Sequence, residues 1–140
     1  MFCKSIEETE KVAKNFVKRL KPRKQATVFG LRGDLGSGKT TFVKSVLVKL
    51  GYNGRVTSPT FVVQKRYKVS RIFKQVIHID AYRLGGTTDL VVLDFLEEVK
   101  KPENLIFIEW PEIVESGLPK NTKIIDFKFV NENTREISFL

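Results

Sequence analysis

Residues 33–40 read Gly-Asp-Leu-Gly-Ser-Gly-Lys-Thr and match the phosphate-binding loop pattern G-x-x-x-x-G-K-[ST] at every position. The segment 26–31 before this loop is short, apolar and rich in β-formers, which is typical of a buried strand. Residues 41–50 after it repeat apolar side chains at helical spacing. A strand, a glycine-rich turn and a helix therefore follow one another in the order that such a loop requires.

The residue types of the loop suit phosphate chemistry. Its three glycines allow positive φ angles, so that backbone N–H groups can surround a phosphate at the N-terminus of the following helix. Lys39 is expected to reach the β- and γ-phosphates of a nucleotide, and the Thr40 hydroxyl is expected to face the Mg²⁺ that bridges them. The residues predicted to bind the nucleotide in this part of the chain are Gly33, Leu35, Gly36, Ser37, Gly38, Lys39, Thr40 and Thr41.

Two further apolar segments end in a carboxylate. Residues 76–79 precede Asp80, and residues 105–108 precede Glu109. If both strands run parallel to the one before the loop, both acids lie at the carboxyl edge of the sheet, where ligands of α/β folds bind. We expect Asp80 to be a Walker B aspartate that binds the metal directly or through water. Glu109 is expected to be a second metal ligand or the group that orients the attacking water.

The rest of the chain predicts an α/β fold that is P-loop NTPase-like, with a mixed, mostly parallel central sheet flanked by helices and a C-terminal β-hairpin. We expect one domain over residues 1–140. The other predicted elements are a helix from Ile6 to Leu20 after a capping box at Ser5–Glu8, antiparallel strands over 61–67 and 74–79, a helix over 89–99, and a hairpin that turns at 131–133.

Composition excludes several classes of protein. The only cysteine, Cys3, rules out an internal disulfide. No apolar run approaches the roughly 18 residues of a membrane helix, and Glu7, Glu8 and Glu10 interrupt any signal-peptide segment, so we expect a cytosolic protein without a membrane partner. The net charge of +9 favours contact with nucleic acid or an acidic protein surface, or simply reflects a lysine-rich proteome. No nucleic-acid motif accompanies the charge.

Three features have alternative interpretations. Residues 57–60, Thr-Ser-Pro-Thr, are either a switch segment whose hydroxyls sense the γ-phosphate or a plain turn. His78 lies within an apolar strand and is expected to be a packed or partner-facing side chain rather than a base. Trp110 either covers the nucleotide or anchors a turn in the core.

Four segments together resemble the bacterial TsaE (YjeE) family: GDLGSGKTTF at 33–42, TSPTF at 57–61, HIDAYRL at 78–84 and IEWPE at 108–112. The resemblance covers nearly the whole chain. It implies a small ATPase that binds ATP and Mg²⁺ and works with the TsaD and TsaB proteins, alongside TsaC. Their product is threonylcarbamoyladenosine at position 37 of tRNAs that read codons beginning with A.

The resemblance also implies residue roles. Thr40 and Glu109 would hold Mg²⁺, Asp80 would take the Walker B role, and Trp110 would lie beside the nucleotide and affect hydrolysis. The predicted catalytic residues are Lys39, Asp80, Glu109 and Trp110. The predicted metal ligands are Thr40, Asp80 and Glu109. Thr9 in the N-terminal segment and Arg135 in the terminal hairpin match family positions near the nucleotide.

Three alternative functions use the same loop. A small-molecule kinase also needs an acceptor-binding domain and an arginine-rich lid, for which the 100 residues after the loop leave little room. A GTPase switch is expected to carry an N-K-x-D motif, which the chain lacks. An ATP-binding regulator with negligible hydrolysis needs the same residues as an ATPase, and the sequence does not separate the two.

Overall fold

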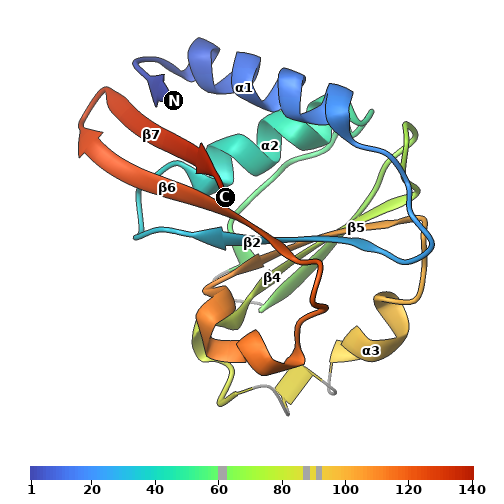
Figure 1. The fold of residues 1–140 in the computed structure, drawn as a ribbon. Helices are drawn as coiled ribbons and strands as arrows, with labels where there is room; N and C mark the ends of the chain where they lie inside the picture. Colours follow the sequence, from blue (N-terminus) through green and yellow to red (C-terminus); the bar gives the residue numbers. More distant parts are fainter. Residues whose placement is uncertain (60–62, 87–88, 91–92) are drawn as a thin grey trace.

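The computed structural model describes residues 1–59, 63–86, 89–90 and 93–140. A seven-stranded sheet in the order β1-β7-β6-β2-β5-β4-β3 forms its centre, and α1 and α2 lie side by side on one face (Figure 1). The strands are β1 (Phe2–Cys3), β2 (Thr27–Arg32), β3 (Gln64–Lys68), β4 (Gln75–Asp80), β5 (Asn104–Glu109), β6 (Lys123–Asn131) and β7 (Thr134–Phe139). The helices are α1 (Ile6–Arg19), α2 (Lys39–Lys49) and α3 (Phe95–Glu98), with 3₁₀ segments η2 (Ala81–Arg83) and η4 (Pro111–Gly117).

The four central strands are parallel. β2 pairs in parallel with β5 and with β6, and β5 pairs in parallel with β4. β3, β7 and β1 are antiparallel to their neighbours. The predicted mixed, mostly parallel sheet with a C-terminal hairpin is therefore confirmed. Because β2, β4 and β5 share a direction, their carboxyl ends meet at one edge of the sheet.

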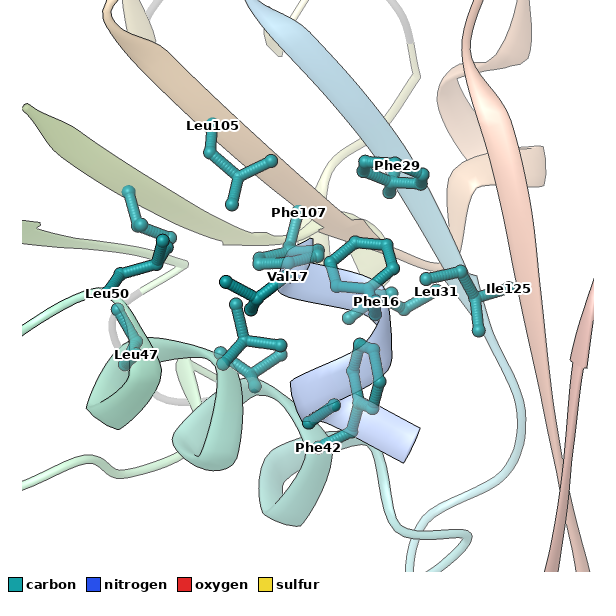
Figure 2. Close-up of a cluster of buried hydrophobic side chains, with 14 of the residues drawn as sticks. Phe16, Val17, Phe29, Leu31, Phe42, Leu47, Leu50, Leu105, Phe107 and Ile125 are labelled. Carbon is teal, nitrogen blue, oxygen red and sulfur yellow. The ribbon is translucent and has the colours of Figure 1, made fainter. Parts of the chain in front are cut away.

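An aromatic cluster fixes α1 and α2 on the sheet. The ring of Phe16 on α1 packs edge-on against Phe29 of β2, with centroids 4.9 Å apart, and against Phe42 of α2, at 5.3 Å. Figure 2 shows these rings together with Phe107 of β5, at the contact of the two helices with the sheet. Each such ring pair contributes about 0.5–1.5 kcal/mol beyond its buried area. The N-terminus of α2, which carries the phosphate-binding loop, is held by this packing.

Helix α1 begins where its sequence predicts. Ser5 is the N-cap, and its hydroxyl accepts a hydrogen bond from the Glu8 backbone N–H at 3.2 Å. The Glu8 carboxylate accepts from the Lys4 backbone N–H at 2.6 Å, one residue before the position that a capping box uses. The helix ends at Arg19, and Leu20 is extended. The predicted helix is thus confirmed to within one residue.

The predicted helix over residues 89–99 is wrong in extent. The only α-helix described there is the four-residue α3, which follows Asp94 in the left-handed region at φ 55°. A residue with that backbone angle interrupts helical hydrogen bonding before the helix. Leu90 and Phe95 instead bury their side chains, 2% and 1% exposed, on the second face of the sheet. Packing on that face has overridden local propensity, and residues 91–92 lie outside the described part of the chain.

Two other boundaries differ from the expectation. The strand predicted over 61–67 begins at Gln64, since Val63 has φ 68°, and residues 61–62 lie outside the described residues. No sequence pattern predicts β1 or η4. Among the described helices, none is long and apolar enough to cross a membrane.

Candidate nucleotide-binding site

The phosphate-binding loop connects β2 to α2 through glycines with positive φ. Gly33, Gly36 and Gly38 have φ of 153°, 80° and 102°. A Cβ at position 33 would lie 2.4 Å from the carbonyl oxygen of Phe127, so the neighbouring β6 strand leaves room only for glycine there. Gly38 is the N-cap of α2 and offers no side chain to its first turn. The free N–H groups of that turn can therefore bind an anion.

Lys39 is buried at the base of the loop. Its ammonium donates a hydrogen bond to the Gly33 carbonyl oxygen and lies 3.5 Å from Glu109 Oε1. It also lies 5.4 Å from the centroid of the Trp110 ring. The cation is thus paired with a carboxylate and an aromatic face at the position where the sequence predicts phosphate binding.

Asp80 and Glu109 are direct register partners on β4 and β5. Both are buried, with 4% and 5% of their surface exposed. The structure therefore brings the two strand-end carboxylates together at the edge that carries the loop. Asp80 Oδ1 also accepts a hydrogen bond from the Tyr82 backbone N–H at 2.9 Å and so caps η2, which fixes the orientation of the carboxylate.

A fully buried histidine lies beside Glu109. His78 Nε2 is 3.0 Å from Glu109 Oε2, but the two groups are not aligned for a hydrogen bond, and neither atom has another hydrogen-bond partner among the described residues. Burial raises the pKa of the Glu109 carboxyl, whereas nearby His78 and the Lys39 ammonium lower it by more. The net pKa is below its ordinary value, which favours an ionised Glu109. The structure places His78 as a packed side chain.

Arg135 and Thr9 reach the loop region from opposite ends of the chain. Arg135 Nε donates to the Gly36 carbonyl oxygen at 2.9 Å, and the guanidinium carbon lies 4.6 Å from the centroid of Phe129. Thr9 is buried near the start of α1 and lines the same pocket. The hairpin and α1 therefore flank the loop on its outer side.

These groups surround one pocket of about 820 Å³. That volume lies within the range of small-molecule and cofactor sites. Of the predicted site residues, all but Gly33 and Ser37 line the pocket: Thr9, Leu35, Gly36, Gly38, Lys39, Thr40, Thr41, Asp80, Glu109, Trp110 and Arg135. Ser37 lies within the loop and is 1% exposed, and its hydroxyl has no hydrogen-bond partner among the described residues.

Several lining residues were not predicted as site residues. They are Cys3, Ser5, Ile6, Asp34, Tyr82, Glu132 and Asn133. Tyr82 packs on Trp110 with ring centroids 5.2 Å apart. The signal for Tyr82 was present, because it closely follows Asp80 at the end of β4. The N-terminal and hairpin-turn residues have no such local signal, since only the fold brings them to the loop.

The segment 57–60 is described only to residue 59. Ser58 lines the pocket, whereas the Thr57 hydroxyl accepts a hydrogen bond from Lys65 Nζ. Thr60 lies outside the described residues. Of the hydroxyl residues described in this segment, Ser58 lines the pocket.

The donors present fit Mg²⁺ bound together with a nucleotide. Glu109 Oε2 is a buried carboxylate oxygen without a hydrogen-bond partner among the described residues, and Thr40 lines the same pocket. No cluster of three His, Cys, Asp or Glu side chains suited to a metal occurs in the described part of the chain. Mg²⁺ in phosphate sites takes one or two protein ligands, and water and phosphate supply the others. The small donor set is therefore sufficient.

A glycine-rich loop at a helix N-terminus, a buried parallel strand before it and two strand-end carboxylates around one pocket define a P-loop NTPase fold. Comparison with known proteins identifies the family. The model for "Threonylcarbamoyl adenosine biosynthesis protein TsaE" matches residues 3–137, and the chain belongs to this family.

Individual relatives agree with this assignment. The chain is 36% identical over 135 residues to the "tRNA threonylcarbamoyladenosine biosynthesis protein TsaE" of Rickettsia felis, covering 96% of this chain and 75% of the relative. The Bacillus subtilis protein of the same description is 35% identical over 133 residues, covering 95% and 79%. A crystal structure of Bacillus subtilis YdiB superposes with a TM-score of 0.78 at 29% identity, covering 99% of this chain and 82% of that one.

Proposed function

We propose that this chain is a Mg²⁺-dependent ATPase of tRNA threonylcarbamoyladenosine biosynthesis, which binds the TsaD–TsaB pair and hydrolyses ATP to support its turnover. The observation that carries the proposal is the buried ion pair of Lys39 and Glu109, at 3.5 Å, beneath a complete phosphate-binding loop. A cation for the phosphates and a carboxylate for the metal are thereby held next to each other in one pocket.

The residues divide into two groups by their proposed tasks. Lys39 and the backbone N–H groups of the loop bind the β- and γ-phosphates, and Thr9 and Arg135 hold the nucleotide from its outer side. Thr40, Glu109 and Asp80 hold Mg²⁺, which supplies charge neutralisation at the phosphates when it is bound. Phosphate binding gives the Lys39 ammonium an anionic partner in place of the Gly33 carbonyl.

Trp110 acts as a wall of the site in this proposal. Its ring lies beside the Lys39 ammonium and Tyr82, so it excludes water from the region where the γ-phosphate binds. The chain is proposed to act as a single domain in the cytoplasm.

The test is ATP hydrolysis by the purified chain, alone and with a purified TsaD–TsaB pair, at increasing Mg²⁺. We expect slow hydrolysis alone, stimulation by the pair, and loss of both in Lys39→Ala. ATP binding without any hydrolysis in the presence of the pair would replace the ATPase with the ATP-binding regulator. Transfer of phosphate to a small acceptor in place of release would replace it with the kinase.

A further inference from the structure

The charge of this chain is divided unevenly along the sequence. Residues 11–79 hold 17 of the 25 Lys and Arg residues but only one of the 16 Asp and Glu residues, Asp34. The remaining 71 residues carry eight basic and 15 acidic side chains. An even distribution would place about half of the acids in each part. The net charge of +9 therefore arises from a strongly basic part joined to a mildly acidic one.

The fold gathers part of this charge at the end of the molecule away from the nucleotide pocket. Helices α1 and α2 both begin at the pocket and run side by side to the opposite edge of the sheet (Figure 1). α1 has 14 residues, which corresponds to about 21 Å at the helical rise. We call seven basic side chains the distal basic face. They lie in the last turns of these helices, in the loop after α1 and in the turn after β3: Lys18, Arg19, Lys21, Arg23, Lys24, Lys49 and Arg71.

Leu20, which follows α1, and Leu50, which follows α2, both pack into the buried cluster between the two helices and the sheet. The turn after β3 is attached to the end of α2, because the Arg71 backbone N–H donates to the Leu50 carbonyl at 3.1 Å. The Arg71 guanidinium also donates to the Lys49 carbonyl oxygen at 3.3 Å.

The side chains of the distal basic face lack ion-pair partners among the described residues. None of its seven side chains forms an ion pair with a carboxylate in the part of the chain that the structure describes, whereas Arg32 and Arg66 elsewhere do so with Asp126 and Glu98. Six of the seven are exposed, and Lys49 is partly buried. A cation at the C-terminal end of a helix gains about 0.3–1 kcal/mol from the helix dipole. That gain accounts for Lys18, Arg19 and Lys49 but not for the residues beyond the helix ends.

We propose that the distal basic face binds the phosphate backbone of RNA. Lysine is depleted from protein–protein interfaces, and four of the seven side chains of this face are lysines. Phosphate backbones are instead bound by such groups of cations, with counterion release as the driving force. tRNA is the RNA expected to occupy the face, and this choice rests on the proposed function.

The experiment measures binding of a fluorescently labelled tRNA transcript, one that reads a codon beginning with A, by anisotropy between 50 and 300 mM salt. The test variant carries three substitutions together: Lys18→Ala, Lys21→Ala and Lys24→Ala. The matched control carries Lys4→Ala, Lys44→Ala and Lys128→Ala together, which lowers the net charge equally from exposed positions outside the distal basic face. A second control replaces the three test lysines with arginine and preserves the charge of the face.

We expect the test variant to lose about tenfold or more in affinity at 0.1 M salt and to lower the slope of log K against log salt by about 2 to 3. Both control variants should bind as the parent does. Equal weakening in the test and location-control variants would overturn the proposal, because net charge alone would then explain binding. Absence of tRNA binding by the parent chain at 0.1 M salt would also overturn it.

Two further measurements distinguish RNA binding by this face from protein binding by the same face and from the proposed ATPase activity. If the test variant binds tRNA normally but loses association with the TsaD–TsaB pair, the face serves an acidic protein surface and the RNA proposal is wrong. ATP hydrolysis without partners should be unchanged in the test variant, since the face lies about 20 Å from the pocket along α1. If the parent chain fails to hydrolyse ATP under any condition but binds tRNA through this face, the proposed ATPase fails and the RNA site stands.

Discussion

Arg135 and Gly36 are 99 positions apart in the sequence, and Arg135 Nε donates a hydrogen bond to the Gly36 carbonyl oxygen at 2.9 Å. The C-terminal hairpin is thereby attached to the phosphate-binding loop. The same guanidinium lies over the Phe129 ring, which limits its freedom. The loop and the hairpin thus line two sides of one pocket.

Replacement of Arg135 should weaken nucleotide binding without unfolding the protein. Arg135→Ala removes the cation that is proposed to contact the nucleotide, and loss of one hydrogen bond to a charged group, about 1.5–3 kcal/mol, corresponds to roughly a 10- to 100-fold loss of affinity. Titration calorimetry with a non-hydrolysable ATP analogue measures this. Lys128→Ala, on the adjacent β6 strand, is the matched control and should bind normally. Equal affinities of Arg135→Ala and the parent chain would remove Arg135 from the site.

Lys39→Ala should abolish most nucleotide affinity. The variant loses the cation that is expected to pair with the β- and γ-phosphates, and it leaves Glu109 without its 3.5 Å partner. We expect a loss of at least about 100-fold by the same calorimetry, together with a lower thermal midpoint. Lys44 lies on the same helix but is exposed. The control variant Lys44→Ala should therefore match the parent in both measurements. Retained affinity in Lys39→Ala would contradict the proposed phosphate contact.

Glu109→Gln should separate binding from hydrolysis. The amide keeps the shape of the side chain but removes the negative charge that is proposed to hold Mg²⁺. We expect ATP affinity within about threefold of the parent and a loss of about 100-fold or more in the rate of Mg²⁺-dependent hydrolysis. Single-turnover assays over a Mg²⁺ series measure both. Full activity at low Mg²⁺ would exclude Glu109 as a metal ligand.

The pair of Arg32 and Asp126 should make stability depend on pH in the acid range. Asp126 accepts two hydrogen bonds from Arg32, at 2.6 and 2.9 Å, and these hold the pKa of its carboxyl below the ordinary value of 3.8. A lowered native pKa contributes stability above the unfolded value, and this stability is lost as the pH falls through the native pKa. The contribution is small because the Arg32 side chain is half exposed.

Asp126→Asn tests this dependence by urea unfolding. The variant should be less stable than the parent at pH 7, and the difference should shrink as the pH falls below about 3.8. Lys123→Ala, at an exposed position at the start of the same strand, should keep the pH profile of the parent. A difference between Asp126→Asn and the parent that stays constant from pH 7 to pH 2 would contradict the ion pair as its cause.

Gly33→Ala should destabilise the fold more than Gly36→Ala. Both positions have positive φ, which costs a non-glycine residue about 1–2 kcal/mol. At position 33 the new Cβ would also meet the Phe127 carbonyl oxygen at 2.4 Å, whereas nothing lies within 4 Å at position 36. Urea unfolding of the two variants measures the difference, which we expect to exceed about 1 kcal/mol. Equal destabilisation would show that β6 moves away from the loop at little cost.

Local sequence patterns predicted the elements whose structure depends on short stretches of the chain. The loop, its flanking strand and helix, and α1 lie within about two residues of their predicted bounds, because glycine spacing, capping and amphipathic periodicity act over short stretches. The pairing of Asp80 with Glu109 was also predictable, since two apolar strands that end in acids must present them at one edge if they are parallel.

Features that depend on distant contacts were not predictable in this way. The short α3 results from packing of Leu90 and Phe95 on the second face of the sheet, and the left-handed Asp94 has no sequence signal. The placement of Thr9 and Arg135 came only from the family resemblance, because no local rule brings α1 and the hairpin to the loop. His78 beside Glu109 required knowledge of the register between β4 and β5.

The pocket takes its lining from nearly the full span of the chain, from Cys3 to Arg135. β1 pairs with β7, and the Met1 ammonium donates to the Ile137 carbonyl oxygen at 2.8 Å. During synthesis, a nascent chain that already contains the phosphate-binding loop still lacks the hairpin that closes the outer side of the site. On the roles proposed for Thr9 and Arg135, a chain that has made the loop but has not yet folded the hairpin against it binds nucleotide only weakly, so that tight binding reports the folding of both distant segments.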